Sequence, residues 1–159
     1  MQQAQVRAAE LGNPEVQPAH LLLALIEDRE GVIPSVLDKI GVPTERLESD
    51  LHQIEEKLPR VSGSTSQPGL SQALNKALEQ AFREAANFKD EYVSTEHLLL
   101  GVAHAKGDAA RDALVDAFQG RGSGRCFGGA IAPRSLARRR GVPRLFVSIC
   151  GRARQNVVR

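Results

Sequence analysis

One segment of this sequence occurs twice, and the duplication constrains the fold more than any other feature. His20–Leu25 (HLLLAL) recurs as His97–Val102 (HLLLGV), at an offset of 77 residues. At the same offset, identical or similar residues continue upstream to Gln3/Gln80 and downstream to Leu37/Leu114, and the match ends near Phe118. Self-similarity of this length indicates two copies of one supersecondary unit that pack against each other.

Apolar residues spaced three and four apart predict that this unit is helical. In the first copy we expect helices over 2–11, 18–26, 31–40 and 44–58, and in the second over 68–87, 94–105 and 108–118. Gly12 is a natural C-terminal stop and Pro18 a natural first helical residue. The expected fold class is all-α, with two pseudo-symmetric four-helix repeats.

The pattern is incomplete at both ends. The first helix of copy one is shorter than its counterpart by roughly ten residues, or two to three turns. This indicates either truncation, which we favour, or a helix that is simply shorter. The eighth helix, expected near 121–135, is missing, because that stretch is rich in glycine. We therefore divide the chain into repeat 1 (1–59), a linker (60–67), an incomplete repeat 2 (68–118) and an irregular tail (119–159).

The tail differs in composition from the rest of the chain. Residues 117–159 contain ten arginines, both cysteines (Cys126 and Cys150) and no lysine, aspartate or glutamate, whereas residues 1–116 contain all 19 acidic residues. One interpretation is an Arg-rich arm that binds nucleic acid or an acidic surface. The other interpretation is the product of a GC-rich gene read out of frame. We favour the frameshift, because the change falls inside a structural unit.

Several chemistries have no support in the sequence. It contains no Gly-x-x-x-x-Gly-Lys-Ser/Thr segment to cradle phosphates, so we expect no ATPase and no other enzyme activity. The four histidines lack the spacing of a metal site, and we predict neither metal nor cofactor. No apolar run reaches about 18 residues, and the first residues lack the features of a signal peptide. We therefore expect a cytoplasmic protein without a membrane partner.

The duplicated segments, taken with their neighbours, resemble a known family. Val16–Leu25 and Asp90–Leu100 are similar to the two halves of the Clp N-terminal repeat domain, which begins the Clp-type AAA+ chaperones. The sequence of these segments is most similar to the ClpB disaggregase type, and Leu58–Gly63 resembles the junction between its repeats. The resemblance covers residues 2–118, and two linked copies make it specific.

The resemblance implies a binding module without catalysis. In this family the domain binds unfolded or aggregated polypeptide through an apolar groove flanked by acidic residues, some members bind adaptor proteins, and the domain precedes AAA+ ATPase modules. Asp90 and Glu96 occupy the positions of the acidic groove residues. From the residues alone another reading stays open, in which Glu96 complements its helix dipole and Asp90 shapes the turn.

Three further expectations concern burial. We expect His20 and His97 to be structural, each bonding a neighbouring backbone group in the first turn of its helix. We expect Glu55 to lie on a solvated face. Because the eighth helix is missing, we expect a marginally stable chain in which some of Leu98, Leu99, Leu100 and Leu114 are bare.

Overall fold

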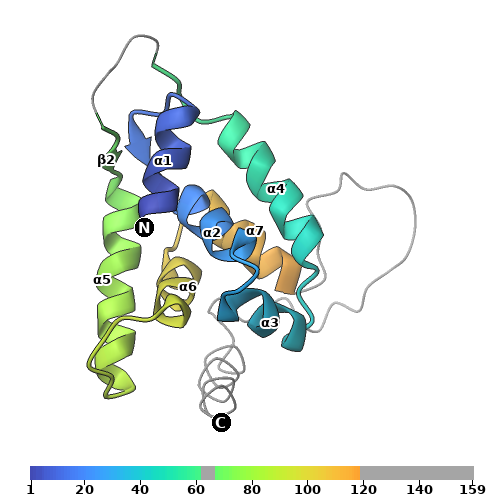
Figure 1. Ribbon diagram of the computed structural model, residues 1–159, viewed down its shortest axis with the longest axis vertical. Coiled ribbons are helices and arrows are strands. Elements are labelled where there is room, and N and C mark those ends of the chain that lie inside the picture. Colours follow the sequence, from blue (N-terminus) through green and yellow to red (C-terminus); the bar gives the residue numbers. More distant parts are fainter. Residues whose placement is uncertain (62–66, 119–159) are drawn as a thin grey trace.

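The computed structural model describes residues 1–61 and 67–118. In these residues the chain forms seven α-helices and two short strands (Figure 1). Copy one contains α1 (Gln2–Glu10), β1 (Glu15–Val16), α2 (Pro18–Glu27), α3 (Val32–Lys39) and α4 (Thr44–Glu56), and copy two contains β2 (Gly69–Leu70), α5 (Gln72–Asn87), α6 (Thr95–His104) and α7 (Ala109–Phe118). The expected all-α fold is confirmed.

The two helices that begin with the duplicated segments form the centre of the molecule. Helix α2 contacts all the other helices, and α6 contacts α2, α3, α5 and α7. Both are apolar on nearly all sides, as a helix surrounded by others must be. Leu22, Leu23 and Leu99 are completely buried. Pro18 is the first residue of α2, as predicted.

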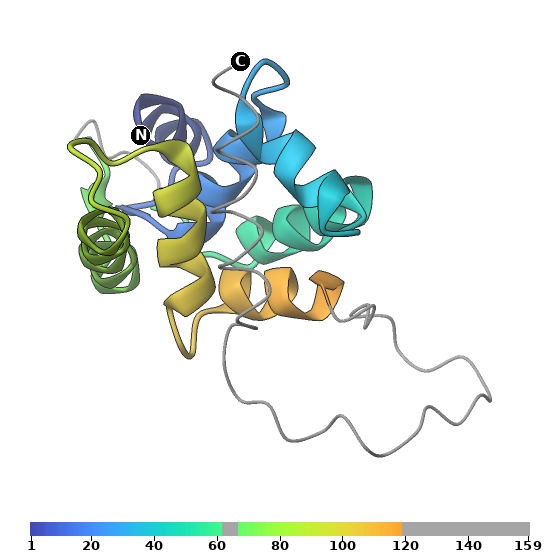
Figure 2. The same cartoon turned by 90° about the horizontal axis from the view of Figure 1, so that it is seen from below.

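The two copies share one core, so neither covers its apolar side chains alone. Helix α7 of copy two packs against α4 and α2 of copy one, and Figure 2 shows α7 alongside α4. Leu99, Leu100 and Leu114 are at most 1% exposed, and Leu98 is half-buried against the same core. The expectation that these leucines are bare is therefore wrong, because the opposite copy covers them. Among the described residues, the exposed large apolar side chains are Met1, Val6, Val61, Leu70, Phe82, Phe88 and Tyr92.

The first helix of each copy ends in the same left-handed turn. After α1, Gly12 has a φ of +71°, and after α5, Lys89 has a φ of +59°. The next amide donates back into the helix in both copies, from Asn13 to Ala8 O at 2.8 Å and from Asp90 to Ala85 O at 2.9 Å. The stop at Gly12 is thus confirmed. In copy two a lysine takes the conformation that favours glycine.

A parallel strand pair, which the sequence did not predict, joins the two copies. Glu15 lies opposite Gly69, and Val16 opposite Leu70. The Gly69 amide donates to Pro14 O at 3.0 Å, and the Ser71 amide donates to Val16 O at 3.1 Å. The predicted helix start at 68 is wrong, because residues 69–70 pair with β1. Helix α5 begins only after Ser71, whose Oγ accepts the Leu74 amide at 3.1 Å.

Helix α1 has 9 residues and α5 has 16, so the first helix is the shorter one, as expected. The tail (119–159), the position of the eighth helix and residues 62–66 lie outside the described residues. The division into repeat 1, linker, repeat 2 and tail stays a prediction. None of the described helices is long and apolar enough to cross a membrane.

Candidate functional site

The connection between α5 and α6 carries both acidic residues that the resemblance assigns to the binding site. It leaves the far end of α5, opposite the end where β2 enters (Figure 1). Asp90 lies three residues after Asn87, the last residue of α5, and its side chain is 22% exposed. Glu96 is the second residue of α6 and is 9% exposed. The structure thus brings the two carboxylates to the start of one helix.

His97 connects this helix start to Asp90. Its Nδ1 accepts a hydrogen bond from the Ser94 backbone amide at 3.0 Å, which completes the N-terminal cap of α6. Because Nδ1 is an acceptor, the ring proton resides on Nε2. That nitrogen lies 3.2 Å from Asp90 Oδ2. The side chain of Asp90 is therefore held against a buried imidazole.

Copy one repeats this arrangement with one chemical difference. The Gln17 amide donates to His20 Nδ1 at 2.9 Å, and His20 Nε2 lies 3.1 Å from Asn13 Oδ1. Asn13 corresponds to Asp90 at the repeat offset. The predicted structural role of both histidines is confirmed. Copy two alone places a charge where copy one has a neutral amide, so the acidic character of the helix start is a property of copy two.

The surroundings of His97 disfavour the protonated ring. Burial lowers the pKa of His97, while the charges of Glu96 and Glu84 oppose this shift. Glu84 is itself buried and accepts a hydrogen bond from Gln80 Nε2 at 2.7 Å. Thr95 Oγ1 donates to Glu96 Oε2 at 3.3 Å. The imidazole, with its Nδ1 lone pair engaged by the backbone, orients groups and has no free atom for acid–base chemistry.

Exposed aromatic side chains occur on α5 and in the α5–α6 connection. Tyr92, in the connection itself, is 79% exposed, Phe82 on α5 is 65% exposed and Phe88 is 37% exposed. The Phe88 ring also packs on His97, with ring centroids 5.8 Å apart. Large exposed aromatic groups are a common feature of surfaces that bind other proteins. This region combines exposed aromatic area with the partly exposed carboxylate of Asp90, whereas Glu96 is largely buried.

Copy one uses its polar residues differently, to tie three helices together. Glu55 on α4 is 3% exposed, so the expectation of a solvated Glu55 is wrong. Its Oε1 accepts a hydrogen bond from Arg7 Nε of α1 at 2.8 Å. Arg7 Nη1 also donates to Glu27 of α2 at 2.8 Å. Glu55 pairs with Arg7, which is 48 residues away in sequence, so no local sequence pattern could predict this burial.

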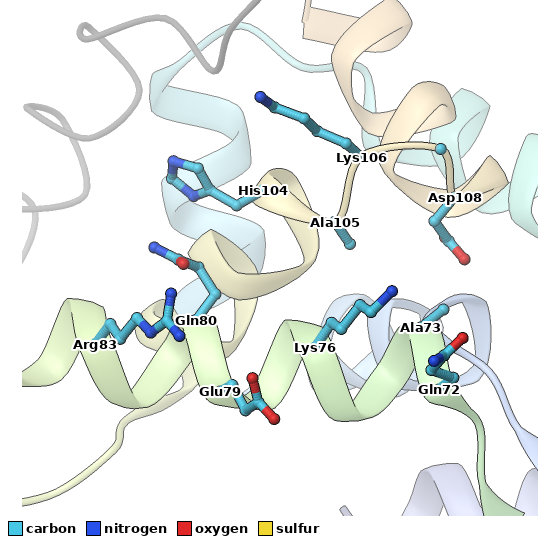
Figure 3. A pocket seen from close by; sticks show the side chains of 11 residues that line it. Gln72, Ala73, Lys76, Glu79, Gln80, Arg83, His104, Ala105, Lys106 and Asp108 are labelled. Atoms are coloured by element: carbon cyan, nitrogen blue, oxygen red, sulfur yellow. The ribbon is translucent and has the colours of Figure 1, made fainter.

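A hollow of about 370 Å³ lies between α5 and the α6–α7 connection (Figure 3). Its charged lining residues are Lys76, Glu79, Arg83, Lys106 and Asp108. Asp108 Oδ1 accepts the Ala110 amide at 2.9 Å at the start of α7, and burial raises the pKa of this carboxyl. Copy one has a corresponding hollow of about 400 Å³ beside Arg7 and Glu27. Neither hollow includes Asp90 or Glu96.

No cluster of histidine, cysteine or acidic side chains within 1–61 and 67–118 is arranged to hold a metal ion. The fold therefore defines a class of protein: a duplicated helical domain whose two repeats share one core. Residues 1–117 match the Clp repeat (R) N-terminal domain, and the chain belongs to this family. The curated relatives that share this domain include the chaperone protein ClpB of several bacteria.

Individual relatives agree with this assignment. The chain is 40% identical to the chaperone protein ClpB of Mycobacterium leprae over 104 residues, which are 65% of this chain and 12% of that protein. It is 32% identical to ClpB of Mycobacterium bovis over 158 residues, covering 93% of this chain and 18% of that protein. The chain thus spans less than a fifth of the length of these relatives.

Solved structures share the fold. The N-terminal domain of Hsp104 from Candida albicans superimposes with a TM-score of 0.63 at 20% identity, covering 73% of this chain and 75% of that domain. A chain from a structural study of the ATPase ClpV of type VI secretion has a TM-score of 0.60 at 28% identity, covering 73% of this chain and 72% of that chain.

Proposed function

We propose that this chain binds unfolded or aggregated polypeptide as the substrate-binding module of a ClpB-type protein disaggregase, with Asp90 and Glu96 as the acidic residues of the site. Adaptor proteins are the alternative partners of the same surface. The observation that carries the proposal is the pair of exposed aromatic side chains, Tyr92 and Phe88, next to the partly exposed carboxylate of Asp90, in a chain of this family.

The chemistry of that surface suits weak and unselective binding. Tyr92 and Phe88 offer exposed apolar area. An unfolded polypeptide can cover this area with its own exposed apolar segments, whereas a folded substrate keeps such segments buried. Asp90 and Glu96 favour segments with nearby Lys or Arg, and steer them by charge. A surface of this size gives transient contacts with Kd values in the micromolar range or weaker. Rapid release would let ATPase modules of the longer protein take over the bound segment.

A direct test uses the full chain and fluorescein-labelled casein, an unfolded protein, with fluorescence polarisation as the readout. We expect saturable binding that weakens about fivefold or more in Tyr92→Ala and in Glu96→Gln. Val61→Ala is the control, because Val61 is also exposed but lies in the predicted linker between the repeats. Absence of saturable binding by the folded chain, or an equal loss in Val61→Ala, would contradict the proposal.

A further inference from the structure

Residues 91–93 of copy two correspond to the strand segment of copy one. At the repeat offset, Pro14 aligns with Glu91 and Val16 with Val93. In copy one this segment accepts an extended piece of chain, β2, through hydrogen bonds to Pro14 O and Val16 O. In copy two the corresponding segment lies at the opposite end of α5 from β2 (Figure 1), so β2 is too far away to pair with it.

The backbone enters and leaves both segments in the same geometry. Each begins after the left-handed turn at Gly12 or Lys89. Each ends at a residue with extended angles that caps the next helix, Gln17 with φ −97° and ψ 161° and Ser94 with φ −91° and ψ 173°. The exposure of the side chains also follows a similar order, with Glu15 and Tyr92 exposed, Val16 buried and Val93 half-buried. The two segments therefore offer their main-chain groups in equivalent positions.

In copy two those main-chain groups have no partner among the described residues. No backbone hydrogen bond within 1–61 and 67–118 involves the amide or carbonyl of Glu91, Tyr92 or Val93. A row of such groups at the surface is a template for another extended chain. Here the template runs between Asp90 and Glu96 and carries the exposed Tyr92.

We propose that an extended segment of the bound polypeptide pairs in parallel with residues 91–93, in the way that Gly69–Leu70 pairs with Glu15–Val16. This inference rests on the proposed function and gives that site its mode of recognition. The ligand residue in the place of Gly69 donates its amide to Glu91 O, and the one in the place of Ser71 donates to Val93 O. In the parallel ladder the Val93 amide donates back to the ligand.

This mode fits an unfolded ligand because every polypeptide carries the same main-chain donors and acceptors. Selectivity then comes from conformation, since a folded protein has few extended segments without partners. The carboxylates of Asp90 and Glu96, on either side of the template, favour Lys or Arg next to the paired residues. Tyr92 contacts the apolar side chains of the ligand.

The first experiment compares Val93→Pro with Val93→Ala in the full chain. Proline removes the one amide that donates to the ligand and suits the extended conformation of the preceding residue, whereas alanine trims the same side chain and keeps the amide. We expect casein affinity to be about fivefold lower in Val93→Pro than in Val93→Ala, with both variants showing the wild-type circular dichroism spectrum. Equal affinities of the two folded variants would overturn the proposal.

In the second experiment a strand added to the same chain occupies the site, and the primary measurement needs no casein. A copy of residues 67–78 inserted between Met1 and Gln2 places Gly69 and Leu70 of the copy where the repeat offset requires them. We expect hydrogen exchange of the Val93 amide to slow by tenfold or more and casein affinity to fall. Slow exchange in a chain that never bound casein would support the strand site and contradict the proposed function. Unchanged exchange at Val93, both in this variant and with casein bound to the wild type, would overturn the strand site.

Discussion

At the scale of single residues, the repeat lets each position be compared with its own counterpart. The left-handed turn after the first helix holds Gly12 in copy one and Lys89 in copy two. A side chain at positive φ costs about 1 kcal/mol relative to glycine. We predict that Lys89→Gly stabilises the chain by about 0.5–1 kcal/mol, measured by urea denaturation. The matched change Gly12→Lys should destabilise it by a similar or larger amount. Destabilisation by Lys89→Gly would show that the lysine side chain stabilises the turn.

A second residue comparison concerns the contact between α5 and α6. A Cβ atom built on Gly101 would collide with the Ala77 carbonyl oxygen, so only glycine allows the two helices to approach this closely. The corresponding residue of copy one is Ala24. We predict that Gly101→Ala lowers the free energy of unfolding by about 1–3 kcal/mol, through the backbone shift that overpacking imposes. Gly69→Ala is the control, because nothing lies within 4 Å of a Cβ there. Equal melting temperatures of the two variants would contradict this prediction.

The buried histidines predict how stability depends on pH. Burial lowers the pKa values of His20 and His97 below the ordinary 6.5, so the unfolded chain binds more protons than the folded chain between those values. Stability should therefore decrease as the pH falls below about 6.5, until the pH reaches the lowered pKa values. The groups that face the two rings are Asp90, Glu84 and Glu96 for His97, and Asn13, Arg7 and Glu55 for His20.

Urea denaturation between pH 7.5 and 5.5 measures this dependence. The His97→Gln variant keeps a side-chain acceptor for the Ser94 amide and lacks a titrating ring. Its free energy of unfolding should therefore fall less steeply over this range than that of the wild type. A wild-type stability that rises as the pH falls to 5.5 would mean that the folded state binds the protons more tightly.

At the scale of elements, α1, α2 and α4 are tied by the pair of Arg7 and the buried Glu55. Removal of one member of a buried pair leaves the other without compensation, at a cost of about 3 kcal/mol. We predict this loss for Arg7→Met and a partial recovery in the double variant with Glu55→Met. A double-mutant cycle by urea denaturation measures the coupling. Additive effects of the two changes would show that the pair contributes nothing beyond its separate side chains.

The elements also show which part of the fold could be predicted from the sequence. The helical spacing of apolar residues predicted α2 and α6. Pro18 marked the first residue of α2, and Gly12 marked the stop after α1. The structural role of His20 and His97 followed from their place in the first turn. The pairing of Glu15 with Gly69 could not be predicted, because the two segments are too short to show alternation and lie far apart in sequence. The burial of Glu55 has the same cause, since it depends on Arg7.

At the scale of the whole molecule, the shared core explains why the expected bare leucines are covered. The candidate site was proposed only through the family resemblance, which pointed to Asp90 and Glu96, and its role stays a prediction. The link from Asp90 to the α6 cap appears only when the repeat is seen in three dimensions. The template at 91–93 required both the observed strand pair of copy one and the repeat offset.

The tail gives a prediction for the complete chain. The tail contains ten arginines, whereas all the acidic residues lie in residues 1–116. Any retention on immobilised DNA should therefore depend on residues 119–159 and fall steeply with salt. We expect deletion of residues 119–159 to abolish retention at low ionic strength. Undiminished retention of the shortened chain would assign DNA binding to the described residues instead.

Helix α7 contacts α4, and α6 contacts α2, so the two repeats meet in the core of the protein. They resemble the two subunits of a dimer with a buried interface. In such an arrangement the peptide between the repeats acts as a tether that raises the local concentration of each half for the other to the millimolar range. The covalent link thereby makes stability independent of protein concentration. Two separate halves would obey the mass-action law of an obligate dimer, and dilution alone would unfold them.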